Sequence, residues 1–180
     1  MRTKKAAMEM SVGTIVTIVL LMSVLVLGLF LIRGIFSSAK GAMDLTDQEL
    51  QAEIKKLFAE DSKLAIYPTS KTVKIKVGND DAIGIGIKNI ATNVNSETSF
   101  SYTTVVVENN CGLTKEQVEK WISLGKSESD IPIPISEIVS GRVTISIPEG
   151  TPNCLARFRV NVQRGSTAYA TDFFEIRVKA

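Results

Sequence analysis

Residues 143–162 read VTISIPEGTPNCLARFRVNV, and this stretch decides the fold class. Apolar side chains stand at every second position from Val143 to Ile147, and the same alternation returns from Leu155 to Val162. Successive side chains of a β-strand point to opposite faces, so a period of two is typical of strands with one buried face. The proline- and glycine-containing segment 148–152 has the composition of a turn. The stretch therefore predicts two strands joined by a turn.

Alternating or β-branched stretches recur from residue 68 onward. They cover residues 72–77, 83–87, 99–108, 131–135, 143–147, 155–162 and 169–178, with turn-forming residues between them. No regular strand-helix-strand order, which parallel sheets require, is present in this part of the sequence. Residues 68–180 are therefore predicted to form an antiparallel β-sandwich of about seven strands.

The N-terminal part of the chain has a different pattern. Residues 1–9 form a short basic leader, and the stretch from Met10 to Ile32 carries no charged side chain. At 1.5 Å per residue these 23 residues would make a helix of about 34 Å, which covers the roughly 30 Å hydrocarbon core of a bilayer. Residues 10–32 are therefore predicted to be a transmembrane helix.

An amphipathic helix is predicted within the juxtamembrane segment 33–67. Thr46 and Glu49 form a capping-box pattern, in which each side chain satisfies a backbone donor of the other residue. The stripe that includes Leu50 and Ile54 makes one helix face apolar. We describe this element as a stalk helix, with three placements open: on the sandwich, on the membrane surface, or as a continuation of the transmembrane helix.

A second capping box, Thr114 with Gln117, begins one short inserted helix. Its apolar stripe runs through Val118, Trp121 and Ile122. A stripe of this kind either plugs one end of a sandwich core or forms a partner-binding face, and we expect it in the core.

The charges and cysteines predict how the chain is oriented. Basic residues precede the apolar stretch within a few positions, which favours a cytoplasmic N-terminus and an extracytoplasmic sandwich at the cell membrane. Cys111 and Cys154 are the two cysteines of the sequence. In an oxidising compartment such a pair typically forms a disulfide, so we predict one between them.

The composition argues against several function classes. The sequence contains no histidine, which removes serine–histidine and cysteine–histidine catalysis, so we do not expect an enzyme, a cofactor or a metal site. Residues 41–180 hold 16 basic and 18 acidic side chains, a balance that predicts no nucleic-acid partner. Asp80 and Asp81 are interpreted as a turn rather than a calcium site, and Gly84 and Gly86 as part of a strand rather than a phosphate loop.

Residues 143–162 also resemble the end of a microbial cell-surface immunoglobulin-like domain of the CARDB and fibronectin-like kind. In those domains a strand ends in a Pro-x-Gly turn and an alternating strand follows, as Pro148–Gly150 and Ala156–Val162 do here. The resemblance implies an immunoglobulin-like sandwich that spaces, presents or adheres. It implies no catalytic or ligand-binding residue.

Residues 4–16, KKAAMEMSVGTIV, resemble the class III signal peptide of archaellins and archaeal type IV pilins. The resemblance implies cleavage between Ala6 and Ala7, after which the apolar helix forms a filament core. Glu9 would then be the third residue, whereas type IV pilins place a glutamate at the fifth. Gly13 and Thr17 have the small-xxx-small spacing that lets helices pack closely.

Three functional hypotheses remain, of which two are non-catalytic and the third is a hydrolase. We favour a single-pass membrane-anchored protein that presents the sandwich for a structural or binding purpose. Its expected partners are membrane lipid, further copies through the N-terminal helix, and a protein or cell-envelope partner through the sandwich. The alternative is a pilin-like or archaellin-like filament subunit, and the third is an anchored hydrolase that uses two carboxylates.

Overall fold

The computed structural model describes residues 13–29, 42, 45–58, 62–93 and 97–179. The chain divides into residues 1–40 and residues 41–180, which are considered separately. In the first unit, residues 13–29 form a helix. None of the helices within the described ranges combines the length and the apolar character that a membrane crossing needs.

The second unit contains nine strands and two helices in its described residues. The strands are β1 (Leu64–Tyr67), β2 (Thr72–Lys76), β3 (Asp80–Lys88), β4 (Ser99–Asn109), β5 (Ile122–Leu124), β6 (Ser127–Pro132), β7 (Ile138–Ser146), β8 (Cys154–Arg164) and β9 (Thr167–Lys179). The helices are α2 (Asp47–Leu57) and α3 (Lys115–Glu119). The mainly β prediction is confirmed, with more strands than expected because β1 and β5 are too short to show an alternating pattern.

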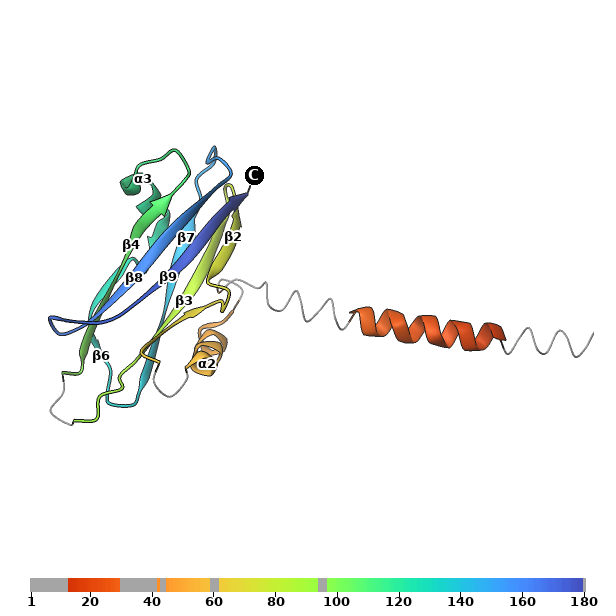
Figure 1. The fold of residues 1–180 in the computed structure, drawn as a ribbon, viewed down its shortest axis with the longest axis horizontal. Helices are drawn as coiled ribbons and strands as arrows, with labels where there is room; N and C mark the ends of the chain where they lie inside the picture. The colour runs from red at the N-terminus through yellow and green to blue at the C-terminus, as the bar shows by residue number, and fades with distance from the viewer. Residues whose placement is uncertain (1–12, 30–41, 43–44, 59–61, 94–96, 180) are drawn as a thin grey trace, which may run out of the picture. The chain divides into compact units, whose positions relative to one another are not determined.

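The strands form two sheets, and Figure 1 shows how they are arranged. One sheet has the order β1-β3-β7-β5 and the other the order β2-β9-β8-β4-β6. Most neighbours are antiparallel, but β2 and β9 run parallel, which corrects the expectation of a purely antiparallel sandwich. The parallel pairing arises because β2 crosses to the second sheet and occupies its edge beside the last strand.

The hydrophobic core lies between the sheets. Its largest fully buried side chains include Trp121, Phe100, Phe158 and Phe174, and the last two rings stack with centroids 5.1 Å apart. Trp121 is 1% exposed, so its predicted core position is confirmed. The inserted helix ends earlier than expected because Ile122 begins β5 and pairs with β7.

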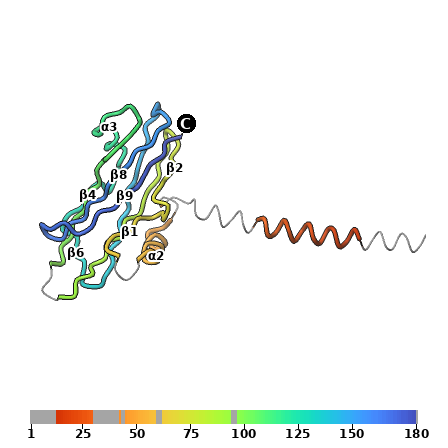
Figure 2. Tube along the Cα trace, in the orientation of Figure 1, coloured from red at the N-terminus to blue at the C-terminus, as the bar shows by residue number. Residues whose placement is uncertain are grey.

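Helix α2 packs on the outer face of the first sheet. Leu50 and Ile54 are 3% and 0% exposed, and the helix contacts β1, β3 and β7. Figure 2 shows α2 beside β1. The guanidinium of Arg142 on β7 donates to the Leu45 carbonyl at 2.6 Å and lies 3.2 Å from the Asp47 carboxylate. Of the three open placements the first is therefore observed, and the description of α2 as a stalk is wrong.

The two glycines of β3 explain why α2 fits against the sheet. A Cβ atom on Gly84 would lie 2.7 Å from Leu50 Cδ1, and one on Gly86 would overlap Ile54 Cγ2. Both glycines face the helix, so the sheet surface there is bare backbone. The prediction that they belong to a strand is confirmed, and their role is to admit a helix.

Candidate functional site

The helix at residues 13–29 is the first candidate functional element. Twelve of its large apolar side chains are exposed, from 48% for Val26 to 70% for Leu21. The Thr17 hydroxyl donates to the carbonyl of Gly13 at 3.1 Å and to that of Thr14 at 2.9 Å, so it bonds within its own helix. A Cβ atom on Gly13 would meet nothing within 4 Å. The predicted cleavage site at Ala6 and Ala7 lies outside the described residues.

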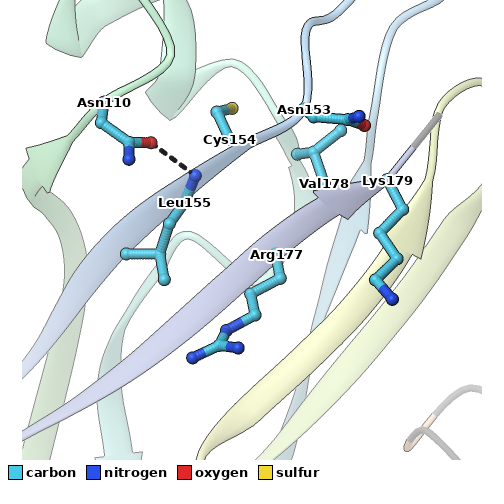
Figure 3. A pocket seen from close by; sticks show the side chains of 7 residues that line it. All are labelled: Asn110, Asn153, Cys154, Leu155, Arg177, Val178 and Lys179. Carbon is cyan, nitrogen blue, oxygen red and sulfur yellow. Dashed lines mark hydrogen bonds between the residues drawn. The ribbon is translucent and has the colours of Figure 1, made fainter.

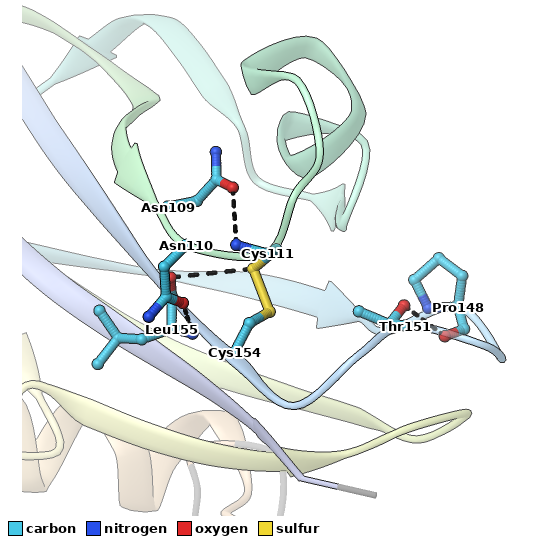
Figure 4. The surroundings of a disulfide bond; sticks show 7 residues. All are labelled: Asn109, Asn110, Cys111, Pro148, Thr151, Cys154 and Leu155. Atoms are coloured by element: carbon cyan, nitrogen blue, oxygen red, sulfur yellow. Dashed lines mark hydrogen bonds between the residues drawn. A yellow bond between two sulfur atoms is a disulfide. The ribbon is translucent and has the colours of Figure 1, made fainter.

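The disulfide joins Cys111 to Cys154, as predicted, and ties the end of β4 to the start of β8 (Figure 4). Their Cα atoms lie 4.9 Å apart. The Asn110 side-chain oxygen accepts from the Leu155 amide at 2.7 Å, and the Asn109 oxygen accepts from the Cys111 amide at 3.1 Å. The cross-link therefore lies in a corner that asparagine side chains also hold together.

The outer face of the second sheet is the second candidate, and we call it the basic face. Alternation in β2, β8 and β9 buries one set of side chains and exposes the other. The exposed set carries six cations: Lys74, Lys76, Arg157, Arg159, Arg177 and Lys179. Among the outward residues of these three strands the only carboxylate is that of Glu175.

Strand pairing places four of these cations side by side. Lys74 is the partner of Arg177 and Lys76 the partner of Lys179 in the parallel ladder of β2 and β9. Neighbouring strands lie roughly 4.8 Å apart, and like charges directly opposite each other destabilise a sheet. The fold therefore holds two repulsive pairs next to each other.

The cations of the basic face lack close ion-pair partners within the described part of the chain. None of the six forms an ion pair with another described residue. Arg157 stands between Glu175 of β9 and the exposed Glu108 of β4 in the register, but its guanidinium lies over the Phe173 ring, 4.8 Å from the centroid. The ion pair nearest to this region joins Lys71 to Asp172 at 2.7 Å. A negatively charged partner would supply the missing counter-charge.

Two shallow hollows border the basic face. One has a volume of about 550 Å³ and is lined by Asn110, Leu155, Arg177 and Lys179, among others. Figure 3 shows Arg177 and Lys179 extending from β9 toward the same side of the sheet. The other, of about 310 Å³, is lined by Lys71, Arg157, Asp172 and Phe173, among others. The first hollow holds two cations and no carboxylate, whereas the second also holds the carboxylates of Asp172 and Glu175, so its charges balance.

The basic face was not predicted from the sequence, because the net charge of residues 41–180 as a whole is close to zero. Residues 41–180 hold 16 basic and 18 acidic residues. Taking away the six cations and Glu175 leaves ten basic and 17 acidic residues, so the balance of the whole unit hides a strong local excess. The runs Lys74-Ile75-Lys76 and Arg157-Phe158-Arg159 were the available signal, but their neighbours across the sheet could not be known.

The remaining candidates from the sequence occupy structural positions. Asp80 and Asp81, interpreted above as a turn, are instead the first two residues of β3, and the Asp81 side chain accepts from the Ala82 amide at 2.7 Å. Gly84 and Gly86 lie in β3 beneath α2. No group of three or more acidic, cysteine or histidine side chains suited to a metal ion occurs in the part of the chain that the structure describes.

No protein-family model matches the sequence, and neither does any curated protein. Among solved structures, the CARDB domain of a Pyrococcus furiosus protein, in complex with di-metal ions, is similar at 13% identity and a TM-score of 0.44, over 65% of this chain and 86% of that one. A Niemann-Pick type C2 protein from Japanese carpenter ant has 12% identity and a TM-score of 0.40, over 66% and 90%. A human PapD-like domain has 13% identity and a TM-score of 0.37, over 68% and 88%. These are distant likenesses, and no residue role is taken from them.

Proposed function

We propose that the protein is a membrane-anchored surface protein whose apolar N-terminal stretch, residues 10–32, holds it in the bilayer. The β-sandwich is then presented outside the membrane for a structural or binding purpose. The observation that carries this proposal is the set of twelve exposed large apolar side chains on the helix at residues 13–29.

The energetics of these side chains support an apolar environment for the helix. Full burial of one large apolar side chain is favourable by roughly 1.5 to 3 kcal/mol. With twelve such side chains about half exposed or more, the cost of leaving the helix in water is on the order of ten kcal/mol. Hydrocarbon removes this cost, and each Leu, Ile or Val in such a helix favours membrane insertion.

The disulfide supports an extracytoplasmic location for the sandwich. Disulfides persist in oxidising compartments and are rare in the reducing cytosol. The basic residues Arg2, Lys4 and Lys5 at the N-terminus fit the same orientation, because positive charge is enriched on the cytoplasmic side. The proposed role is non-catalytic, in keeping with a sequence that has no histidine and a sandwich whose distinctive surface is a row of cations.

A pilin-like or archaellin-like subunit is the second candidate. The leader resemblance at residues 4–16 favours it, and the apolar helix would then leave the bilayer and pack against helices of other copies. Mass spectrometry of the native N-terminus separates the two functions. A chain that begins at Ala7 supports the filament subunit and overturns permanent anchoring, whereas an intact Met1 supports the anchor.

Membrane fractionation tests the anchor directly. We expect the full chain to stay in the membrane pellet after an alkaline carbonate wash, and external protease to reach the sandwich in intact cells. The double substitution Leu21→Arg/Leu25→Arg should release the chain, since each arginine costs about 2.5 to 3.5 kcal/mol at a helix centre. Gln48→Arg/Gln163→Arg adds the same charge at exposed positions of the other unit and should stay membrane-bound. Recovery of the wild-type chain in the wash would refute the proposal.

A further inference from the structure

We infer that the basic face binds an extended acidic polysaccharide, a partner class that rests on the extracytoplasmic display proposed above. The six cations stand in successive rows across the sheet. Lys76 and Lys179 form one row, and Lys74 and Arg177 form the next. Arg157 and then Arg159 continue in the two following rows on β8.

These rows form a track rather than a single spot. From the row of Lys179 to the row of Phe173 and Arg159 the sheet advances six residues, or about 20 Å at 3.3 Å per residue. One small anion would cover only part of this length. A linear polymer with repeated negative charges contacts the whole track, so its charges meet successive cations.

The hollow at the Lys179 end fits a hydroxyl-rich ligand. Asn110 lines it with Arg177 and Lys179, and its volume is about 550 Å³. Arginine binds a carboxylate through two parallel hydrogen bonds. The Asn110 side-chain oxygen already accepts from the Leu155 amide, and its nitrogen offers two donors to hydroxyl groups. A uronic acid unit offers a carboxylate and several hydroxyls within one sugar ring.

Two other polyanionic partners fit the basic face less well. Peripheral binding to a bilayer inserts exposed apolar side chains, and Leu124, on β5 of the other sheet, is the one large hydrophobic that is strongly exposed in the described part of this unit. Single-stranded nucleic acid stacks its bases on exposed aromatic rings. Phe173 is half-buried and lies under the Arg157 guanidinium, so it does not offer a bare ring to a base.

Binding of the full-length protein to immobilised polygalacturonate tests the inference. The protein is kept in a neutral detergent, and dextran serves as the uncharged polymer. We expect retention on polygalacturonate that weakens as salt rises, and none on dextran. The substitution Lys74→Gln/Arg177→Gln should weaken binding about tenfold, as expected when two exposed charge contacts are lost.

The matched control is Lys115→Gln/Lys120→Gln, which removes two exposed cations at and just beyond α3 and should leave binding unchanged. Because Lys74→Gln/Arg177→Gln relieves a repulsive pair, its melting temperature should equal or exceed that of the wild type. Equal weakening by both double substitutions, no retention on polygalacturonate, or tighter binding to single-stranded DNA or to anionic vesicles would overturn the inference. Detergent removes membrane retention from the readout, so failure of the anchor and failure of polysaccharide binding give separate results.

Discussion

Replacing Gly86 by alanine tests how α2 is held against the sheet. The added Cβ atom would overlap Ile54 Cγ2 and would lie 2.8 Å from Phe58 Cε2. Real Cβ atoms do not make such close contacts, so the helix must shift or the side chains must leave their rotamers. Overpacking of this kind costs about 1 to 3 kcal/mol.

Detachment of the helix sets an upper limit on that cost. If α2 left the sheet, Leu50 and Ile54 would lose their burial, which is worth roughly 1.5 to 3 kcal/mol for each side chain. The protein adopts the cheaper response, so we expect a loss of about 1 to 3 kcal/mol. For a unit of this size that loss lowers the melting temperature by about 3 to 9 °C.

Thermal unfolding and amide hydrogen exchange of the full chain in neutral detergent measure both effects. We expect Gly86→Ala to lower the melting temperature and to speed exchange within residues 47–57. Gly141→Ala is the matched control, because its Cβ would lie 3.8 Å from the Tyr102 hydroxyl oxygen, an ordinary contact. In an Ile54→Ala background the alanine at position 86 should cost less, since the overlapping Ile54 Cγ2 is gone and the approach to the Phe58 ring remains. Equal melting temperatures for Gly86→Ala and Gly141→Ala would refute the reasoning.

Three further expectations concern stability. Reduction of the Cys111–Cys154 disulfide opens a 44-residue loop and should lower the free energy of unfolding by about 4 kcal/mol, measured by denaturation with and without reductant. Thr46→Ala removes the side chain that accepts from the Glu49 amide and should cost about 1 kcal/mol in α2, measured by amide exchange against the exposed substitution Gln48→Ala. Burial raises the pKa of the Tyr102 hydroxyl above 10.0, so its contribution to stability is complete below that pH and is lost as the pH rises through the folded-state pKa. The melting temperature of Tyr102→Phe should therefore fall less than that of the wild type above about pH 10, and parallel curves would contradict this assignment.

Local patterns predicted much of the fold. The strands at residues 72–77 and 83–87 were predicted close to their observed bounds, because alternation is a property of one segment and needs no partner. Both capping boxes, Thr46 with Glu49 and Thr114 with Gln117, are formed for the same reason. The elements that the sequence did not predict, β1 and β5, are four and three residues long and exist only because a neighbouring strand pairs with them.

The glycines of β3 have a role that depends on a distant segment of the chain. The alternation Ile83-Gly84-Ile85-Gly86-Ile87 predicted a strand, and the isoleucines do face the core. Nothing in the run indicated that its other face would be covered, since that depends on a helix about 30 residues earlier in the chain. The absence of side chains at Gly84 and Gly86 is explained only by the packing of Leu50 and Ile54 against them.

The sequence by itself determined most of the strands, where α2 and α3 begin, which two cysteines can join, and that residues 10–32 are uncharged. It did not predict β1 or β5, and it placed the strand that is observed as β6, Ser127–Pro132, at residues 131–135. Only the tertiary structure decided that β2 lies parallel to β9, which brings Lys74 to Arg177 across about 100 residues of chain. The physical reason is that strand pairing joins distant segments through backbone hydrogen bonds that carry no residue identity. A chain that is nearly neutral over residues 41–180 therefore folds into a unit with one strongly basic face.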